Sequence, residues 1–343
     1  MLTRREMIQM GALAGAALVL PSERAVRAFT ADPGSGVAPF SVPLTVPSVL
    51  RPSRRTATTD FYDVDIREAM AELLPGRRTR IWGYDGLFPG PTIRARRGRR
   101  VVVRQHNRLR VPVNVHLHGG HVAALDDGHP MRLIRPGKFK DYHYPNLQPA
   151  ATLWYHDHVH HFTSRNIYMG LAGLYLLADP REAALRLPSG PFDVPLVLQD
   201  RTFRSDGSLL FRPNHFSVVG NTLLVNGRPQ PFFAVSARRY RLRFVNASNS
   251  RSYRLRLSSG QPLIQIASDG GLLRAPHPTR EIELWPAERA EAIVDFSGQT
   301  PGSSVVLENA ADGGSAGQVM RFDITGPAPD PAGCRRGWAR SSA

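Results

Sequence analysis

The stretch Ala151-Thr-Leu-Trp-Tyr-His-Asp-His-Val-His-His-Phe162 joins a short apolar run to four histidines within six positions. The run from Ala151 to Trp154 predicts a β-strand, because short apolar segments with β-branched and aromatic residues favour extended backbone. Residues two apart in a strand point to the same face, about 7 Å from each other. His156 and His158 would therefore present two imidazoles side by side, in a chain that has only twelve histidines.

A second pair with the same spacing is His116-Leu-His118. One straight strand cannot easily give both histidines to one ion, because nitrogen ligands must lie within roughly 2 Å of it. Two neighbouring strands would instead offer four imidazoles to two or three ions. Imidazole suits copper, zinc, iron and nickel, so the ligand type leaves the metal open. A single histidine is more often an ordinary hydrogen-bonded residue, but two such pairs favour a metal site.

The histidines that follow the second pair, His160 and His161, break this spacing. At least one of them must point away from the others, since neighbours in a strand face opposite sides. We expect them to be neighbours of the site and not its ligands.

Short β-type runs continue on both sides of the histidine stretch. The chain holds 30 glycines and 29 prolines, which favours many short strands joined by turns over long helices. Helical periodicity is found only in the segment 67–74. The strands expected in the first half are Val64–Ile66, Thr79–Gly83, Thr92–Arg94, Arg100–Arg104, Val111–His118 and Ala151–Trp154.

A proline-bearing, partly charged segment, 179–195, interrupts the pattern before a second β series begins. Its expected strands have the same regular spacing, which predicts an all-β fold of sandwich or barrel domains. We predict a linker or extended arm over 29–59, domains over 60–180 and 190–326, and a disordered tail over 327–343. The second series is Leu196–Leu198, Leu223–Val225, Tyr240–Val245, Tyr253–Leu257, Leu263–Ala267, Ala292–Phe296, Val305–Leu307 and Val319–Ile324.

The first residues indicate export. Leu2-Thr-Arg-Arg-Glu-Met-Ile8 is typical of the start of a twin-arginine signal, and Val26-Arg-Ala28 offers small residues for cleavage. The apolar run between them is about half the length of a bilayer span. We therefore predict a signal peptide over 1–28 and a periplasmic or extracellular protein; a retained amphipathic anchor is the alternative.

The net charge of +16 comes from arginines scattered along the whole chain, with only two lysines. A nucleic-acid partner would need these charges gathered in one patch, so we expect a solvated surface and no nucleic-acid binding. Cys334 is the sole cysteine, which excludes a disulfide within the chain.

The ordered motifs of residues 60–325 resemble the first two domains of multicopper oxidases, nearest to the bacterial spore-coat laccase and bilirubin oxidase group. Several motifs agree in order, so the resemblance is specific. For the first domain they are Phe88-Pro-Gly-Pro-Thr-Ile-Arg94, His116-Leu-His-Gly-Gly120, Asp127-Gly-His-Pro130, Leu153-Trp-Tyr-His-Asp-His158 and Tyr168-Met-Gly-Leu-Ala-Gly173. For the second they are Gln199-Asp-Arg-Thr-Phe203, Leu224-Val-Asn-Gly227, Tyr240-Arg-Leu-Arg-Phe-Val-Asn-Ala-Ser248, Ser268-Asp-Gly-Gly271 and Pro286-Ala-Glu-Arg-Ala290.

The resemblance implies tandem cupredoxin domains, each a Greek-key β-sandwich. By motif position it implies that His116 is a ligand of a type 2 copper, and that His118, His156 and His158 are ligands of a type 3 copper pair. It also implies that Asp127 handles protons beside the type 2 ion, which a carboxylate can do by orienting a metal-bound water. The alternative for Asp127 is an ordinary Asp-Gly turn.

The sequence departs from a complete three-domain oxidase, whose third domain adds H-x-x-H-x-H and H-C-H motifs. No histidine follows His277, and Cys334 lies between glycine and arginine. A blue type 1 copper site needs a cysteine thiolate with two histidines, so we expect this chain alone not to be a competent laccase.

We interpret the chain as a truncated copper-binding oxidoreductase of the laccase type that lacks the type 1 copper domain. Its expected partners are copper ions, O2 and an unknown reducing substrate. One alternative is a second chain that supplies the third domain. The other is an exported copper-binding or scaffold protein without catalytic activity, as in the related copper-free cell-division proteins. Because the histidine-lined face would be exposed, we also expect self-association.

Overall fold

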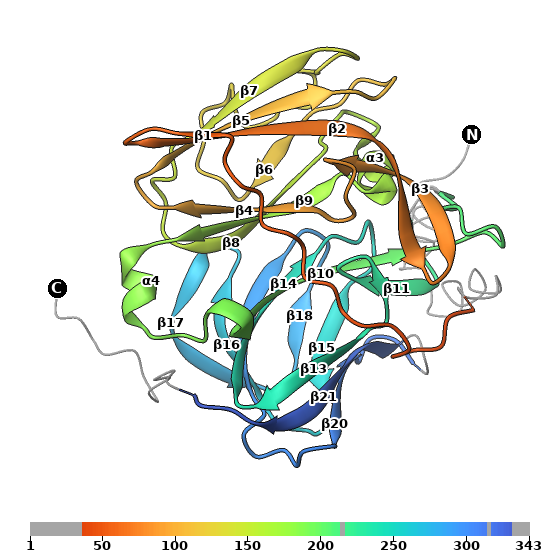
Figure 1. Ribbon diagram of the computed structural model, residues 1–343, viewed down its shortest axis with the longest axis vertical. Coiled ribbons are helices and arrows are strands. Elements are labelled where there is room, and N and C mark those ends of the chain that lie inside the picture. The colour runs from red at the N-terminus through yellow and green to blue at the C-terminus, as the bar shows by residue number, and fades with distance from the viewer. Residues whose placement is uncertain (1–35, 213–216, 314–316, 331–343) are drawn as a thin grey trace, which may run out of the picture.

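The computed structural model describes residues 36–212, 217–313 and 317–330, and in it two β units lie one above the other (Figure 1). The expected signal peptide, the start of the arm, His215 and residues 331–343 of the tail, with Cys334, lie outside these residues. The start of the predicted disordered tail is ordered, because Pro327 ends β21 and Asp330 pairs with Arg238. No helix of the described part has the length and apolar character needed to cross a membrane. The all-β fold class predicted from the strand rhythm is confirmed.

The first unit is built from two sheets that face each other. Their strand order is not sequential, because parallel pairing joins β2 to β5 and β4 to β9. One sheet contains β1 (Arg54–Arg55), β2 (Thr59–Leu74), β3 (Arg77–Tyr84), β5 (Arg100–Asn107) and β7 (Phe139–Tyr144). The other contains β4 (Gly90–Arg96), β9 (Ala172–Ala178), β8 (Ala151–His156) and β6 (His116–His118) in that order.

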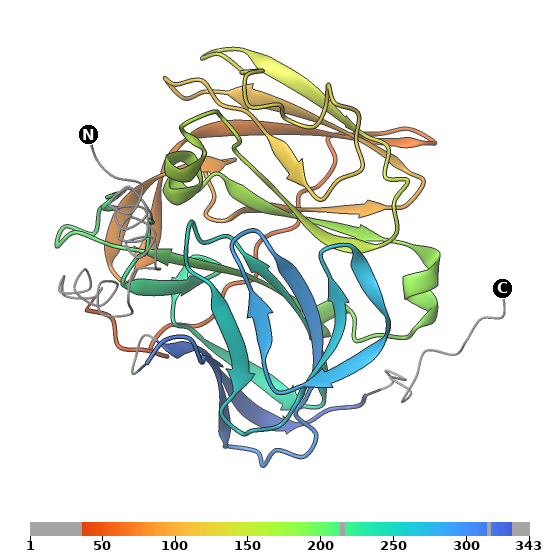
Figure 2. The same ribbon diagram turned by 180° about the vertical axis from the view of Figure 1, so that it is seen from behind.

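The second unit repeats this two-sheet arrangement, as the view from behind also shows (Figure 2). Its larger sheet has the order β12 (Arg228–Pro229), β11 (Thr222–Val225), β10 (Asp193–Arg201), β14 (Arg239–Asn246), β19 (Arg289–Asp295), β16 (Leu263–Ser268) and β17 (Gly271–Thr279). Its smaller sheet has the order β13 (Phe232–Ala237), β21 (Gln318–Pro327), β20 (Ser304–Asn309), β15 (Tyr253–Leu257) and β18 (Ile282–Leu284).

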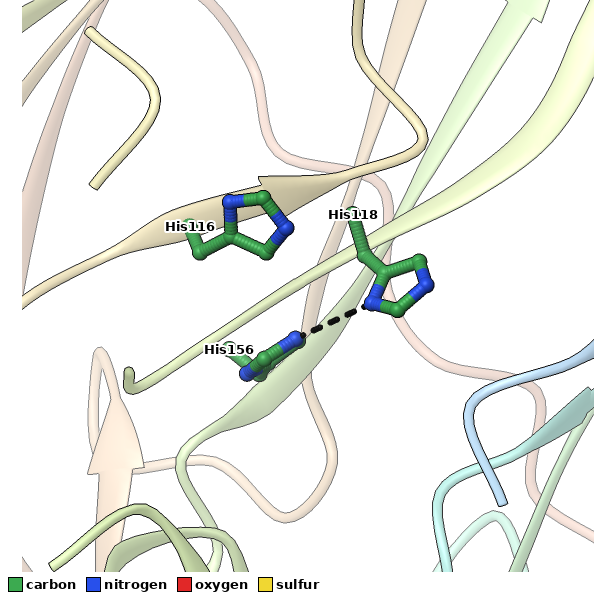
Figure 3. A group of neighbouring side chains, drawn as sticks. All are labelled: His116, His118 and His156. Atoms are coloured by element: carbon green, nitrogen blue, oxygen red, sulfur yellow. Dashed lines mark hydrogen bonds between the residues drawn. The ribbon is translucent and has the colours of Figure 1, made fainter. Parts of the chain in front are cut away.

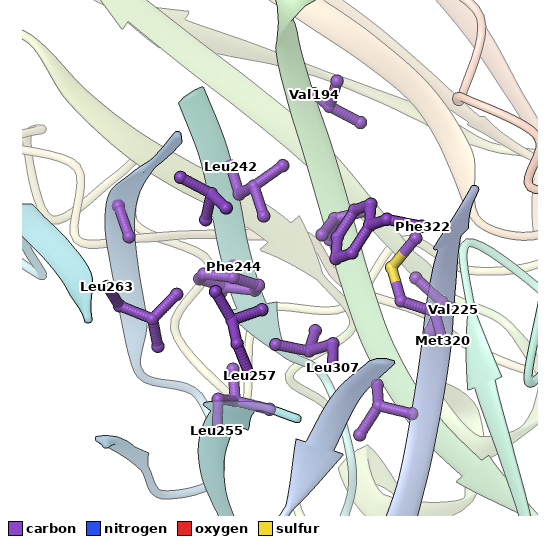
Figure 4. Close-up of a cluster of buried hydrophobic side chains, with 14 of the residues drawn as sticks. Val194, Val225, Leu242, Phe244, Leu255, Leu257, Leu263, Leu307, Met320 and Phe322 are labelled. Carbon is purple, nitrogen blue, oxygen red and sulfur yellow. The ribbon is translucent and has the colours of Figure 1, made fainter. Parts of the chain in front are cut away.

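Each unit closes around its own apolar core. In β14 the alternate residues Leu242 and Phe244 are fully buried and meet Leu255, Leu307 and Phe322 of the opposite sheet (Figure 4). Burying a side chain of this size contributes about 1.5–3 kcal/mol. The period of two in the sequence therefore forms the sandwich, because one face of each strand points into the core.

The helices are short and lie in the connections. They are α3 (Thr163–Met169), α4 (Pro180–Ala184) and a 3-10 turn, η1 (Gly190–Phe192). At α4 the Asp179 side chain accepts from the Glu182 N–H at 2.8 Å and Pro180 occupies the first turn. Both features favour a helix start, so the interruption predicted over 179–195 contains one helical turn.

The arm before β1 touches both units. Pro43 forms a parallel bridge with Phe232 of the second unit, and Val49 forms one with Thr92 of the first. The Leu50 N–H donates to the Thr92 carbonyl at 2.9 Å. The described part of the arm is thus extended backbone fixed by hydrogen bonds to both units.

Two expectations about local structure were wrong. The segment 67–74, which has helical periodicity, is the second half of β2 and pairs with β3. Its pairing with β3 satisfies the backbone along its length, and such tertiary contacts override a weak local preference. The strand expected over 111–118 is formed only at His116–His118, with an isolated bridge between Val113 and Ile134. Helix α3 was not predicted.

The layer between the units is both apolar and charged. Trp154 and Leu174 of the first unit pack with Val197 and Val245 of the second. Beside them lies a buried ion network in which two guanidinium groups meet three carboxylates and a hydroxyl. Its members are Thr152 of β8, Glu182 of α4, Asp193 of β10, Arg241 and Arg243 of β14, and Glu291 of β19.

Candidate metal centre

Strands β6 and β8 pair in an antiparallel register that places His116 opposite His156 and His118 opposite Trp154. Residues directly opposite on one face have Cβ atoms about 4.5–5.5 Å apart. The two histidine pairs of the sequence therefore meet across one strand pair, and the rings of His116, His118 and His156 gather on one side of it (Figure 3).

These three histidines form a group able to hold a metal ion, since one nitrogen of each lies within 4.8 Å of the others. His118 Nδ1 and His156 Nε2 are 3.3 Å apart. Two ligands at about 2.0–2.1 Å from one ion, separated by a tetrahedral angle, would themselves be about 3.3 Å apart. Without an ion the same contact is a hydrogen bond between the two rings, in which His118 Nδ1 donates to His156 Nε2. It joins histidines of two strands, as the straight geometry of one strand requires.

Two main-chain carbonyls orient the rings. His116 Nδ1 lies 2.5 Å from the Asp127 carbonyl oxygen, and His156 Nδ1 lies 2.7 Å from the Asp157 carbonyl oxygen. A carbonyl can only accept, so in both rings Nδ1 is the protonated nitrogen and Nε2 keeps its lone pair. Such hydrogen bonds fix the tautomer and direction of metal-binding imidazoles.

The fourth predicted ligand, His158, belongs to the ring cluster but not to the group of three. Its ring centroid lies 5.1 Å from that of His116 and 5.7 Å from that of His156. Its Nδ1 atom is buried and has no hydrogen-bond partner. A buried nitrogen without a partner is unfavourable.

The remaining two histidines of the stretch lie apart from the group of three. His160 and His161 are exposed and contact each other, with ring centroids 3.8 Å apart. His161 has a positive φ of 64°, which turns the chain away from the strand direction.

Burial lowers the pKa of three of the clustered rings, those of His118, His156 and His158, which favours their neutral form. Burial, with a smaller contribution from Arg289, lowers the pKa of His118 from 6.5 to about 4. Burial also lowers the pKa of His156 well below its usual value and lowers that of His158. A neutral imidazole is the form that binds a metal, so the fold holds these side chains ready to act as ligands.

Two large side chains beneath the rings were not recognised in the sequence. Trp154 stacks against His118, with centroids 5.4 Å apart, and against His156, with centroids 4.2 Å apart. Arg289 of the second unit donates to the Thr152 and Asp269 carbonyls. The apolar run Leu153-Trp-Tyr155 signalled burial, but no local pattern placed Arg289 of β19 beside β8.

A third group missed in the sequence is Asp157, which lies between two of the predicted ligands and is fully buried. Its carboxylate accepts from the Asn114 N–H at 3.0 Å, the Val159 N–H at 3.1 Å and the Asn166 side chain at 2.9 Å. Burial nevertheless raises the pKa of Asp157 to about 6. These bonds join the approach to β6 to the loop after β8.

The structure places Asp127 next to His116. Its carbonyl makes the short contact described above, while a carboxylate oxygen lies 3.4 Å from the same His116 Nδ1 and is about half exposed. Gly128 follows with a φ of +75°, and a Cβ there would meet the Val115 carbonyl. The Asp-Gly turn is therefore present, and its proton-handling role stays a prediction.

Comparison with known proteins gives the same family throughout. A model of the multicopper oxidase family matches residues 65–182. The chain is 38% identical to a laccase of Bacillus subtilis over 336 residues, which cover 83% of this chain and 65% of that protein. It is also 38% identical to the cell division protein FtsP of Yersinia pestis over 299 residues, which cover 86% and 60% of the two chains.

The solved structure of a laccase from Pediococcus acidilactici superposes with a TM-score of 0.79 and 32% identity, covering 88% of this chain and 67% of that one. The chain spans about two thirds of the length of the laccases it matches. The expected tandem cupredoxin-like sandwiches are confirmed by this likeness. The chain belongs to the multicopper oxidase family.

Proposed function

We propose that the chain binds copper through His116, His118, His156 and His158, and that it is the copper-binding part of a laccase-like oxidoreductase. The observation that carries this proposal is that one ring nitrogen of each of His116, His118 and His156 lies within 4.8 Å of the others. The B. subtilis relative is named a laccase. Copper held by these residues would supply one-electron chemistry.

The chain's own residues would hold and shield the ion. The Asp127 and Asp157 carbonyls keep the Nε2 atoms of His116 and His156 directed at it. Trp154 covers one side of the rings and excludes water there. The half-exposed Asp127 carboxylate is suitably placed to exchange a proton with solvent beside His116. By family resemblance a full cluster takes eight histidines, so further ligands would come from polypeptide outside the described residues.

The decisive test is copper stoichiometry. We expect the purified chain, reconstituted with Cu(II) and desalted, to retain copper that the double variant H118Q/H156Q does not retain. The matched control is H160Q/H161Q, which removes the same number of imidazoles from exposed positions and should leave the stoichiometry unchanged. Equal copper in the wild type and in H118Q/H156Q would refute the assignment.

The electron-transfer activity is a separate proposal. Oxidation of a reducing substrate, coupled to reduction of O2 to water, also needs a copper–thiolate site. The single cysteine, Cys334, has no adjacent histidine, so we expect the copper-loaded chain to be colourless and inactive toward phenols by itself. An intense blue band, or turnover of a phenol by the chain alone, would contradict this.

A non-catalytic role is the second candidate, and the likeness to FtsP favours it. Such a scaffold has no physical need for three histidines whose ring nitrogens lie within 4.8 Å of one another, so copper retention decides between the two functions. Co-purification of a second chain would support a partner that completes the site. Self-association is tested by light scattering, where a monomer at all concentrations would oppose it.

We also propose export by the twin-arginine pathway, on the basis of Arg4-Arg5 and the apolar run that follows. Replacing both arginines by lysine should retain the protein inside the cell. Periplasmic or secreted protein from that variant would argue against the pathway.

A further inference from the structure

Arg201, the last residue of β10, has a completely buried side chain. Its guanidinium donates to three main-chain carbonyls: Nε to Tyr168 at 2.7 Å, Nη2 to Ile167 at 2.9 Å, and Nη1 to Asp200 at 2.7 Å. Arg243, in contrast, meets two carboxylates. The buried Arg201 charge is thus compensated chiefly by main-chain carbonyls. Because burial of a charge is costly, a structural or functional reason for it is expected.

Two of the three carbonyls belong to the last turn of α3, where helix geometry leaves carbonyls short of intrahelical donors. The Ile167 carbonyl also accepts from the Gly170 N–H at 3.0 Å. The rigid fork of an arginine can satisfy two such groups at once. Tyr168 strengthens the attachment: its ring lies 4.5 Å from the Arg201 guanidinium, and its hydroxyl accepts from the Thr202 N–H at 2.8 Å. Helix α3 follows β8 of the first unit, yet the second unit holds its end.

From α3 the contacts continue to the metal centre. The Asn166 side chain, in the middle of α3, donates to the Asp157 carboxylate at 2.9 Å. The same carboxylate accepts from the N–H groups of Val159 and Asn114. Val159 follows His158 directly, and Asn114 comes two residues before His116. One carboxylate therefore fixes the segments that carry both histidine pairs.

We propose that Arg201 is a positioning residue for the metal centre of the first unit, acting through α3, Asn166 and Asp157. The proposal rests on the proposed copper binding only for its functional consequence. Its structural content is that the second unit, through one buried cation, holds the loop that follows His156, the last residue of β8, and that carries His158. Mutation of residues that orient metal ligands without contacting the ion typically lowers metal affinity by about 10–100-fold.

The test compares R201M with R238M. Methionine keeps an unbranched apolar stem but removes every donor. Arg238 is a buried arginine of the second unit that binds the Pro329 carbonyl and Asp330, so R238M should lower stability without touching α3. R201K keeps the charge but not the branched set of guanidinium donors. It should therefore lie between the wild type and R201M in amide exchange and in Cu(II) affinity.

The first readout uses metal-free protein. We expect amide hydrogen exchange of Asn114 and Val159 to accelerate in R201M relative to the core strands, and not in R238M. The second readout is the affinity for Cu(II) alone, which should fall about 10–100-fold in R201M. If R201M does not fold, N166L breaks the next link of the same chain of contacts and should give the same local result.

Wild-type exchange at Asn114 and Val159 in R201M or N166L would overturn the inference. So would a Cu(II) affinity equal to that of the wild type in a folded R201M. If the wild type itself binds no Cu(II), the proposed function fails, whereas the exchange measured on metal-free protein still decides the role of Arg201.

Discussion

Strands β6 and β14 carry the same pattern of residues with opposite outcomes. His116-Leu-His118 and Arg241-Leu-Arg243 each place a leucine between two basic residues. Both leucines are buried in the core of their own sandwich. Since side chains alternate in a strand, the basic residues of both triplets face away from that core.

The cross-strand partners make the difference. Arg243 lies opposite Glu291 of β19, and its Nη1 is 2.9 Å from that carboxylate. His116 lies opposite another histidine, His156. The first arrangement satisfies its charges within the protein. The second gathers ring nitrogens that hydrogen-bond to main-chain carbonyls and to each other, and it brings one nitrogen of each of three histidines within 4.8 Å of the others. The same strand period thus yields a buried ion network between the units in one case and a set of metal ligands in the other.

The largest effect on stability is expected when the buried ion network between the units is disrupted. E291Q removes the charge that both Arg241 and Arg243 contact in a buried setting, and loss of one partner of a buried pair costs about 3–5 kcal/mol. Urea unfolding should show this loss in the free energy of unfolding. The matched control is E308Q, because the Arg256–Glu308 pair is partly exposed and solvent-accessible pairs contribute about 0–1 kcal/mol. Equal losses would contradict the contrast.

The ligand set should respond in copper affinity instead. H156Q keeps a side chain of similar length but removes the imidazole nitrogen that can bind a metal. We therefore expect at least a tenfold loss of Cu(II) affinity, which is about 1.4 kcal/mol. The stability of the metal-free protein should fall less than in E291Q, since no buried charge is left without its partner. Calorimetric titration and thermal unfolding measure the two quantities; a stability loss as large as that of E291Q would remove the distinction.

The two regions should also differ in pH dependence. The pKa of His118 is about 4 when folded and near 6.5 when unfolded, so the unfolded chain binds more protons between these values. His118 should therefore contribute a loss of stability as pH falls from 6.5 toward 4, a contribution that H118Q lacks when its profile is compared with that of the wild type.

Glu291 titrates at a lower pH than His118 does in unfolding. Burial raises the pKa of Glu291, but Arg243 and Arg241 outweigh burial and hold it below its usual range. For an acid with a lowered pKa, stability is lost only as pH falls below the usual glutamate range. E291Q should therefore leave the profile above pH 5 parallel to that of the wild type. A profile for H118Q that matches the wild type between pH 6.5 and 4 would contradict the assignment of this window to His118.

The smallest effect is expected at Asp127. Its carbonyl and not its carboxylate makes the short contact with His116, so D127N should change Cu(II) affinity by no more than about fivefold, the range of an exposed charge pair. A larger loss in D127N would show that the carboxylate itself holds the ring.

The sequence by itself determined the strand period, the two series of strands and the H-x-H spacing, because these depend only on neighbouring residues. It did not determine the conformation of the segment 67–74, whose backbone pairs with β3. It also did not determine helix α3, whose Tyr168 carbonyl accepts from Arg201. The role of Asp157 was equally hidden, since its partner Asn114 lies 43 residues before it and Asn166 lies on a helix that was not predicted.

Only the tertiary structure decided that His116 pairs with His156 and that His118 Nδ1 comes within 3.3 Å of His156 Nε2. Periodicity states which face a side chain takes, whereas a metal centre requires distances between strands that are far apart in the sequence. Those distances depend on register, and register is set by the packing of whole sheets. The histidine types are therefore local information, and their convergence is a property of the fold.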